Sequence, residues 1–138
     1  MDQSGKSSGN RNSRRRLGRR GEALAAEYLH ARGYQILECN YRTAYGEIDL
    51  IALQPAALVG SEGQVLVFVE VKTRSSNAYG YPEEAVTASK QTHLIQSAQA
   101  YLQAHPEQAG DWRIDVIAIR MGRLPGKVEI KLFENAVH

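Results

Sequence analysis

Glu70 and Lys72 are the residues of this sequence whose types and spacing point most clearly to chemistry. They lie in the segment Gln64–Thr73, which is otherwise made mostly of Val, Leu and Phe. Such a continuous, β-branched apolar run predicts a strand that is buried on both faces. Because an unpaired charge is expensive to bury, a glutamate and a lysine in this strand need partners or a task. Side chains alternate along a strand, so both project from the face that also holds Leu66 and Phe68.

A second carboxylate, Asp49, stands among aliphatic residues in the preceding strand candidate, Glu47–Leu53. If the two strands pair as a hairpin, Asp49 and Glu70 come close together. Two such carboxylates repel each other unless a cation joins them, and Mg²⁺ is bound in this way, with water and substrate phosphate completing its coordination. Lys72 could then orient or deprotonate an attacking water, or stabilise charge on a phosphate. The alternative is that Glu70 and Lys72 form a simple salt bridge on a solvated face.

The elements that must position these residues follow in the order α-β-β-β-α-β-β. The helix candidates are residues 17–32, which Gly33 ends, and Lys90–Ala104, which Ser89 caps and Pro106 closes, with a short helical turn expected over Pro82–Val86. The strand candidates are Tyr34–Cys39, Glu47–Leu53, Gln64–Thr73, Trp112–Arg120 and Lys127–Phe133. Three strands followed by a helical crossover into another strand predict one α/β domain over residues 17–138, with a mixed sheet and a helix on each face. Trp112 is expected in its core.

Length and composition favour a single soluble domain. At 138 residues, 43% of them apolar and 23% charged, the chain has room for one core and not for two. No apolar run approaches the roughly 20 residues of a membrane span, and the polar, basic N-terminus lacks the apolar stretch of a secretory signal. The single cysteine, Cys39, can neither form an internal disulfide nor hold a structural zinc alone. We therefore expect a cytoplasmic protein with no membrane association.

Charge is unevenly distributed along the chain. Of its 17 Lys and Arg and 15 Asp and Glu, residues 1–20 hold seven basic side chains and one acid, which leaves 10 basic and 14 acidic side chains in the rest. Residues 1–16 are rich in Ser, Gly, Asn and Arg and are predicted to form a disordered basic arm. Such an arm, with Arg19 and Arg20 after it, could bind nucleic acid, because each phosphate contact releases a counterion. The alternative is a solvated leader that only improves solubility.

Two motifs make the sequence similar to a known family. Gly46–Ile51 (Gly-Glu-Ile-Asp-Leu-Ile), followed by Val67–Arg74 (Val-Phe-Val-Glu-Val-Lys-Thr-Arg), resembles the YraN family of predicted bacterial endonucleases. That family is similar to the archaeal Holliday junction resolvases of the PD-(D/E)xK nuclease superfamily, and the resemblance extends from about Leu17 to Ala136. It implies a restriction-endonuclease-like fold, a DNA substrate (branched DNA among the candidates), Mg²⁺ or Mn²⁺ as cofactor and, as in the resolvases, a homodimer. Where the superfamily has a proline before its acid, this chain has Ile48.

The same resemblance assigns roles to individual residues. Carried over by position, it implies that Asp49, Glu70 and Lys72 are catalytic and that Asp49 and Glu70 bind the metal. Glu22, which lies 11 residues before Gly33, matches a glutamate that completes the metal site of the resolvases. The alternative for Glu22 is an ordinary exposed glutamate of a helix.

Other residues are expected around this centre. Lys90 stands where related nucleases have a polar residue that reaches towards phosphate; otherwise it is an ordinary lysine at the start of a helix. Glu47 shares a strand face with Asp49. It is therefore expected to support the metal ligands, to be a spare ligand, or to pair with Arg42 or Arg74. Arg42, Arg74 and Arg113 are further candidate phosphate contacts, in addition to Arg19 and Arg20.

Several other classes of site are disfavoured by the sequence. The histidines are scattered, and no Gly-x-Ser-x-Gly or phosphate-binding glycine loop is present, which argues against zinc, serine-hydrolase and nucleotide-switch chemistry. The leading hypothesis is a Mg²⁺-dependent endonuclease that selects DNA by structure rather than by sequence. One rival is a nucleic-acid-binding protein with the same fold and no turnover. The other is a structural or interaction protein whose Glu70–Lys72 pair is only a salt bridge.

Overall fold

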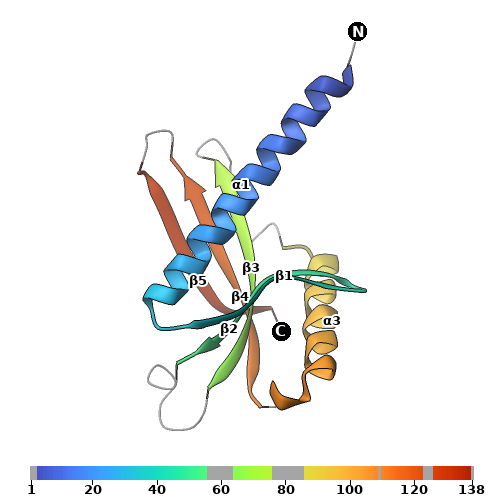
Figure 1. The fold of residues 1–138 in the computed structure, drawn as a ribbon, viewed down its shortest axis with the longest axis vertical. Helices are drawn as coiled ribbons and strands as arrows, with labels where there is room; N and C mark the ends of the chain where they lie inside the picture. Colours follow the sequence, from blue (N-terminus) through green and yellow to red (C-terminus); the bar gives the residue numbers. More distant parts are fainter. Residues whose placement is uncertain (1–2, 56–63, 76–85, 109, 123–125, 138) are drawn as a thin grey trace.

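The computed structural model describes residues 3–55, 64–75, 86–108, 110–122 and 126–137 (Figure 1). Within these ranges the helices are α1 (Gln3–Ala31), α3 (Ala88–Ala104) and a short 3₁₀ turn, η2 (Pro106–Gln108). The strands are β1 (Gln35–Thr43), β2 (Gly46–Gln54), β3 (Val65–Ser75), β4 (Trp112–Met121) and β5 (Val128–Val137). The element order predicted from the sequence is thus confirmed. The helical turn predicted over Pro82–Val86 lies outside the described residues, apart from Val86.

The strands form one mixed sheet in the order β1-β2-β3-β4-β5. β3 and β4 run parallel because the chain passes through α3 between them, whereas the other neighbouring strands are antiparallel. Helix α1 packs on one face of the sheet and α3 on the other (Figure 1). This is the predicted α/β architecture, and it is consistent with a restriction-endonuclease-like fold.

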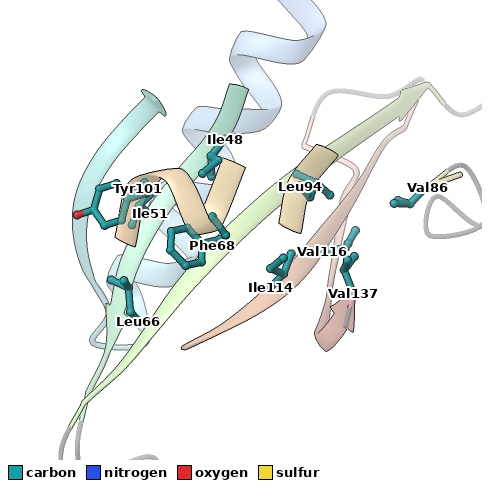
Figure 2. Packing of buried hydrophobic residues seen from close by; sticks show 11 residues of the cluster. Ile48, Ile51, Leu66, Phe68, Val86, Leu94, Tyr101, Ile114, Val116 and Val137 are labelled. Carbon is teal, nitrogen blue, oxygen red and sulfur yellow. The ribbon is translucent and has the colours of Figure 1, made fainter. Parts of the chain in front are cut away.

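The alternation of side chains along β3 fills a separate core on each face. Leu66 and Phe68 pack on the α3 face, as Figure 2 shows, while Val67 and Val69 pack on the α1 face. Glu70 follows Leu66 and Phe68 on the α3 face and is buried as they are. The central strand therefore carries a carboxylate to the end of the α3-side core. None of the described helices is long and apolar enough to cross a membrane.

Helix α1 differs most from the sequence prediction. Where a disordered arm is predicted over residues 1–16, α1 begins at Gln3 and continues through the segment. The physical reason is that nothing there stops a helix. Residues 1–31 contain no proline, arginine is a good helix former, and each residue added to an existing helix gains one hydrogen bond. The division of the chain into an arm and a domain at residue 17 stays a prediction.

Two smaller predictions are wrong. The N-cap of α3 is Thr87, whose hydroxyl accepts a hydrogen bond from the backbone N–H of Lys90 at 3.2 Å, and not Ser89, which lies inside the first turn. Trp112, which was expected in the core, is 36% exposed. It begins β4 at the end of the sheet, where its ring contacts that of Phe68 edge to face, with ring centroids 5.7 Å apart.

Helix α1 makes a very close approach to β3 at Gly21. A Cβ atom on this buried glycine would overlap the hydroxyl oxygen of Thr73. That hydroxyl is itself buried and has no hydrogen-bond partner among the described residues. Gly21 therefore sets how near the helix lies to the strand. This distance in turn fixes where the next residue, Glu22, stands relative to the sheet.

We expect Gly21→Ala to lower the free energy of unfolding by about 1–3 kcal/mol, the usual cost of forcing an extra methyl group into a packed contact. Adding Thr73→Ala should recover part of this loss, because the overlapping hydroxyl is then gone. Urea unfolding followed by circular dichroism measures both variants.

Gly18→Ala is the matched control, because a Cβ atom there meets nothing within 4 Å. It should leave the stability unchanged or raise it, since alanine is the better helix former. A Gly21→Ala variant as stable as Gly18→Ala would contradict the close approach.

Candidate metal centre and nucleic-acid interface

Asp49 lies at the point where β2 and β3 part. Among the described residues, β2 pairs with β3 from Gln54 back to Leu50, and the pairing ends there, next to Asp49. The alternation of β2 is also broken here, since Ile48 and Ile51 face the same core although they are three residues apart. The carboxylate of Asp49 accepts a hydrogen bond from the backbone N–H of Val71 at 2.8 Å. In a regular hairpin this N–H group would donate to a backbone carbonyl of the neighbouring strand. Here the side chain of Asp49 accepts its hydrogen bond instead.

The carboxyl group of Asp49 is held in an environment that disfavours its charge. Burial, the largest cause, and the nearby charge of Glu70 raise the pKa of Asp49 to about 8, and Glu22 adds to the rise. The hydrogen bond from Val71 and the charge of Lys90 act in the opposite direction and lower this pKa. The surroundings therefore favour the protonated form of Asp49 when no cation is bound. A cation that displaced this proton would also relieve the repulsion between the acids.

Glu70 is almost wholly buried, with only 5% of its side chain exposed. Its Oε1 atom lies 3.2 Å from Nζ of Lys90 and 3.6 Å from Nζ of Lys72. Lys72 reaches it from β3, and Lys90 reaches it from the first turn of α3. The two ammonium groups provide the opposite charge that a buried carboxylate requires. The alternative of a salt bridge on a solvated face does not fit this burial.

Glu22 of α1 and Glu47 of β2 bring two more carboxylates to Asp49. The three side chains offer carboxylate oxygens that all lie within 4.8 Å of one another. Asn40 of β1 bridges the two glutamates, since its Nδ2 donates to Oε1 of Glu22 at 3.0 Å and to Oε1 of Glu47 at 3.1 Å. Glu47 also pairs with Arg42, Oε2 to Nε at 3.5 Å, an exposed contact that adds little stability. Glu22 and Glu47, for which the sequence left alternatives open, therefore both lie beside Asp49.

Asn40 is a site residue that the sequence analysis missed. Its φ of +53° lies in the left-handed region, which asparagine tolerates better than most residues. It stands between the β1 residues that pair with Ile48 and Leu50, and so lies across from Asp49. An asparagine inside a strand is uncommon and is the signal that was available. The two glutamates that it binds come from other elements, however, and no spacing rule connects them to it.

A cleft of about 590 Å³ lies beside the glutamates. Its described lining is Arg15, Gly18, Arg19, Glu22, Asn40, Arg42 and Glu47. The cleft thus combines arginines, which bind phosphate, with carboxylates, which bind cations. Two of the predicted phosphate contacts, Arg19 and Arg42, lie here. A third, Arg20, is exposed on α1 outside this lining, and Arg74 of β3 lines a second cleft together with Arg14 and Leu17 of α1.

Arg113, a candidate phosphate contact in the sequence, is instead part of a buried network. Its Nε donates to both carboxylate oxygens of Asp115, at 2.9 and 3.1 Å. Its Nη1 donates to Oε1 of Gln54 at 2.6 Å, and its Nη2 donates to the hydroxyl of Tyr34 at 3.3 Å. Asp115 is fully buried, so the guanidinium neutralises a core carboxylate and joins β4 to β2. The guanidinium group of Arg113 is therefore not available to bind phosphate.

The described residues fit a hard divalent cation. Carboxylate oxygens are the donors that such ions prefer, and three are close together at Glu22, Glu47 and Asp49. The raised pKa of Asp49 agrees with this, because burial, its largest cause, and the nearby charges of Glu70 and Glu22 all disfavour an ionised Asp49 that has no cation beside it. Glu70, the other predicted ligand, is not in this group of three and is held by Lys72 and Lys90.

Comparison with known proteins finds relatives of similar length. The family described as "Uncharacterised protein family UPF0102" matches residues 21–119. A UPF0102 protein of Chlorobium chlorochromatii is 52% identical over 110 residues, which cover 80% of this chain and 78% of the relative. UPF0102 proteins of Alkaliphilus oremlandii and Symbiobacterium thermophilum are 44% and 45% identical over 124 residues, which cover 88% and 90% of this chain and 97% and 98% of the relatives. The matched range includes the site residues from Glu22 to Lys90.

We expect the free energy of unfolding of the metal-free protein to fall as the pH rises from about 4 to about 8. The pKa of Asp49 is about 8 in the folded protein against an ordinary value of 3.8. The folded state therefore holds an extra proton in this range, and stability falls by up to about 1.4 kcal/mol per pH unit. Asp49→Asn has no proton to lose and should give a flatter profile. Urea unfolding in EDTA over this pH range measures the difference.

Asp111→Asn is the control, because Asp111 is exposed and the change removes the same charge. It should keep the slope of the wild-type protein. Parallel profiles for the wild-type protein and Asp49→Asn would contradict the raised pKa.

Proposed function

This chain belongs to the uncharacterised protein family UPF0102, the YraN family that its motifs resemble, and we propose that it is a metal-dependent endonuclease acting on DNA. The observation that supports this most is the gathering of Glu22, Glu47 and Asp49, whose oxygens lie within 4.8 Å of one another, near the buried Glu70 and its partly exposed partner Lys72. Several carboxylates and a lysine around one point are what phosphodiester hydrolysis with a hard ion requires. The names of these relatives state no activity, so the proposal rests on the site.

The acids and the lysines have separate tasks in this proposal. Asp49, Glu70 and Glu22 hold the ion, with Glu47 as a further carboxylate within reach. Bound Mg²⁺ or Mn²⁺ would lower the pKa of a water molecule and polarise the phosphate. In the reaction that we propose, water attacks phosphorus and one P–O ester bond breaks, which leaves a phosphate monoester and a free hydroxyl group.

Exposure distinguishes the two lysines. The side chain of Lys72 is 20% exposed and that of Lys90 is 43% exposed. The more buried Lys72 is fixed on β3 and is the better residue to orient the attacking water. Lys90 is the better residue to contact a phosphate that arrives from solvent. Glu70 must release at least one of these ammonium groups when it becomes a ligand, and that release makes a lysine available to the substrate.

The arginines determine the class of substrate in this proposal. Arg19 and Arg42 line the acid-bearing cleft, and Arg20 and Arg74 extend the positive charge beyond it. Contacts from arginine to phosphate position a nucleic acid without reading its bases, so we assign a preference for DNA structure, branched DNA included. The proposal places the protein in the cytoplasm. It also includes a homodimer, because two copies related by symmetry can cut two strands.

A second candidate function is nucleic-acid binding without turnover. The observation that favours it is the double salt bridge of Glu70, which satisfies this carboxylate without an ion. In that case Lys72 and Lys90 keep the site closed to metal. The arginine-lined cleft would then account for binding by itself.

We expect cleavage of labelled DNA with Mn²⁺ or Mg²⁺, and a rate at least about 100-fold lower for Asp49→Asn and Lys72→Ala, because each removes a group that acts at the reacting phosphate. The substrates are duplex, single-stranded, flap and four-way-junction DNAs of one sequence. Circular dichroism confirms that each variant is folded.

Lys131→Ala is the matched control, since Lys131 is an exposed lysine of the edge strand β5. Its rate should equal that of the wild-type protein. If Lys72→Ala cuts as fast as this control, the assignment of Lys72 is wrong. If no form cuts any substrate and binding persists, the second candidate function replaces the first.

A further inference from the structure

The N-terminal half of α1 forms a ridge between two clefts. Gly18 lines the cleft beside the glutamates, and it also lines a second cleft of about 470 Å³, whose other helix residues, Arg14 and Leu17, lie on another flank of α1 than Arg15 and Arg19. The described lining of the second cleft is Arg14, Leu17, Gly18, Thr73, Arg74 and Ser75. In Figure 1 this part of α1 passes the end of β3 and extends beyond the sheet. The helix is therefore exposed between two hollows rather than covered by neighbouring elements.

The two clefts differ in charge. The first holds Arg15, Arg19 and Arg42 together with the carboxylates Glu22 and Glu47. The second has two arginines and no acid among its described lining residues. Both can bind a phosphate backbone, but only the first brings that backbone to candidate metal ligands. One cleft is thus suited to binding and cutting, and the other to binding alone.

Helical spacing explains why the arginines diverge. Arg15, Arg19 and Glu22 follow one another at intervals of four and three residues, which places them on one side of α1. Arg14 and Gly18, at the same spacing, lie on the neighbouring side, towards Thr73 of β3. Consecutive residues of the Arg14–Arg16 run therefore serve different clefts. The cationic run is not a uniform patch, because it is divided by the helix that carries it.

The dimensions of this ridge match those of a DNA groove. An α-helix with its side chains is about 10–12 Å wide, and the major groove of B-form DNA, about 12 Å wide, admits one. The two phosphate backbones that border the groove would then lie on opposite sides of the helix. The major groove of A-form RNA is deep and narrow and does not admit a helix. A single strand needs only one of the two clefts.

We propose that α1 lies in the major groove of B-form duplex DNA, with one backbone in the acid-bearing cleft and the other held by Arg14 and Arg74 in the second cleft. The part of this inference that says which strand is cut rests on the proposed function. The duplex contact itself does not. It makes the substrate of the site a double-stranded arm rather than a single strand or an RNA duplex.

The test is equilibrium binding in EDTA, where no ion is available for cleavage, to a labelled DNA duplex, the matching single strand and an RNA duplex of the same sequence. For Arg14→Ala/Arg74→Ala we expect the affinity for DNA duplex to fall at least about fivefold, and the slope of log affinity against log salt to decrease by about 2. The affinity for the single strand should change less than twofold, and the wild-type protein should bind the RNA duplex more weakly than the DNA duplex.

The control, Arg32→Ala/Lys131→Ala, removes the same charge elsewhere. Arg32 follows the last turn of α1, roughly 27 Å along the helix axis from Arg14, and its guanidinium lies over the ring of Tyr28. This control should bind duplex as the wild-type protein does. An equal loss of affinity in the control, an equal loss for duplex and single strand, or equal affinity for the RNA duplex would each overturn the inference.

A direct probe of the groove completes the experiment. Bulky substituents at C5 of the pyrimidines project into the major groove and should weaken duplex binding, whereas a drug that fills the minor groove should not compete. The reverse pattern would overturn the inference. Selective duplex binding without any cleavage would leave this inference standing and remove the proposed nuclease. Cleavage of duplex by both double variants, with unchanged affinity, would keep the proposed nuclease and overturn this inference.

Discussion

The separation of β2 from β3 at Asp49 is the constraint on which the site depends. A hairpin that stayed paired would bury its backbone groups in a ladder and leave no space for water or phosphate between the strands. Here the N–H of Val71 is bonded by the carboxylate of Asp49, so the sheet opens without leaving a buried donor unpaired. The same bond fixes the carboxylate in the opening. Regular pairing as far as Val69 provides the rigid support from which Glu70 and Lys72 extend.

Glu70 and Asp49 are accommodated in the protein in two different ways. Glu70 stays close to two ammonium groups, whereas the environment of Asp49 favours its protonated form. Both arrangements cost stability compared with an apolar core, because buried charges and like charges are unfavourable. A divalent cation that replaced the proton of Asp49 or a lysine beside Glu70 would relieve either of them. If the proposed ion binds here, it should therefore stabilise the folded protein.

The sequence was sufficient to predict the elements whose pattern is local. The apolar strand around Glu70, the face that it shares with Phe68, and the helix on each side of the sheet all follow from periodicity, and the structure agrees. It was not sufficient where a contact joins distant elements. Asn40 reaches glutamates that lie 18 residues before it and seven residues after it, and Arg113 reaches Gln54 across 59 residues. Such partners depend on strand register and helix position, which periodicity does not determine.

Helix α1 links the chemistry to the surface that surrounds it. Glu22 lies one turn after Gly18, the residue that borders both clefts, and directly after Gly21, where the helix comes closest to Thr73. A displacement of the helix at this contact would therefore move a candidate metal ligand and both rows of arginines together. The absence of a side chain at position 21 lets the helix lie close to β3, and this close contact makes the helix a rigid reference for Asp49. A loop could present the same arginines, but it would not hold Glu22 at a fixed distance from the strands that carry the other acids.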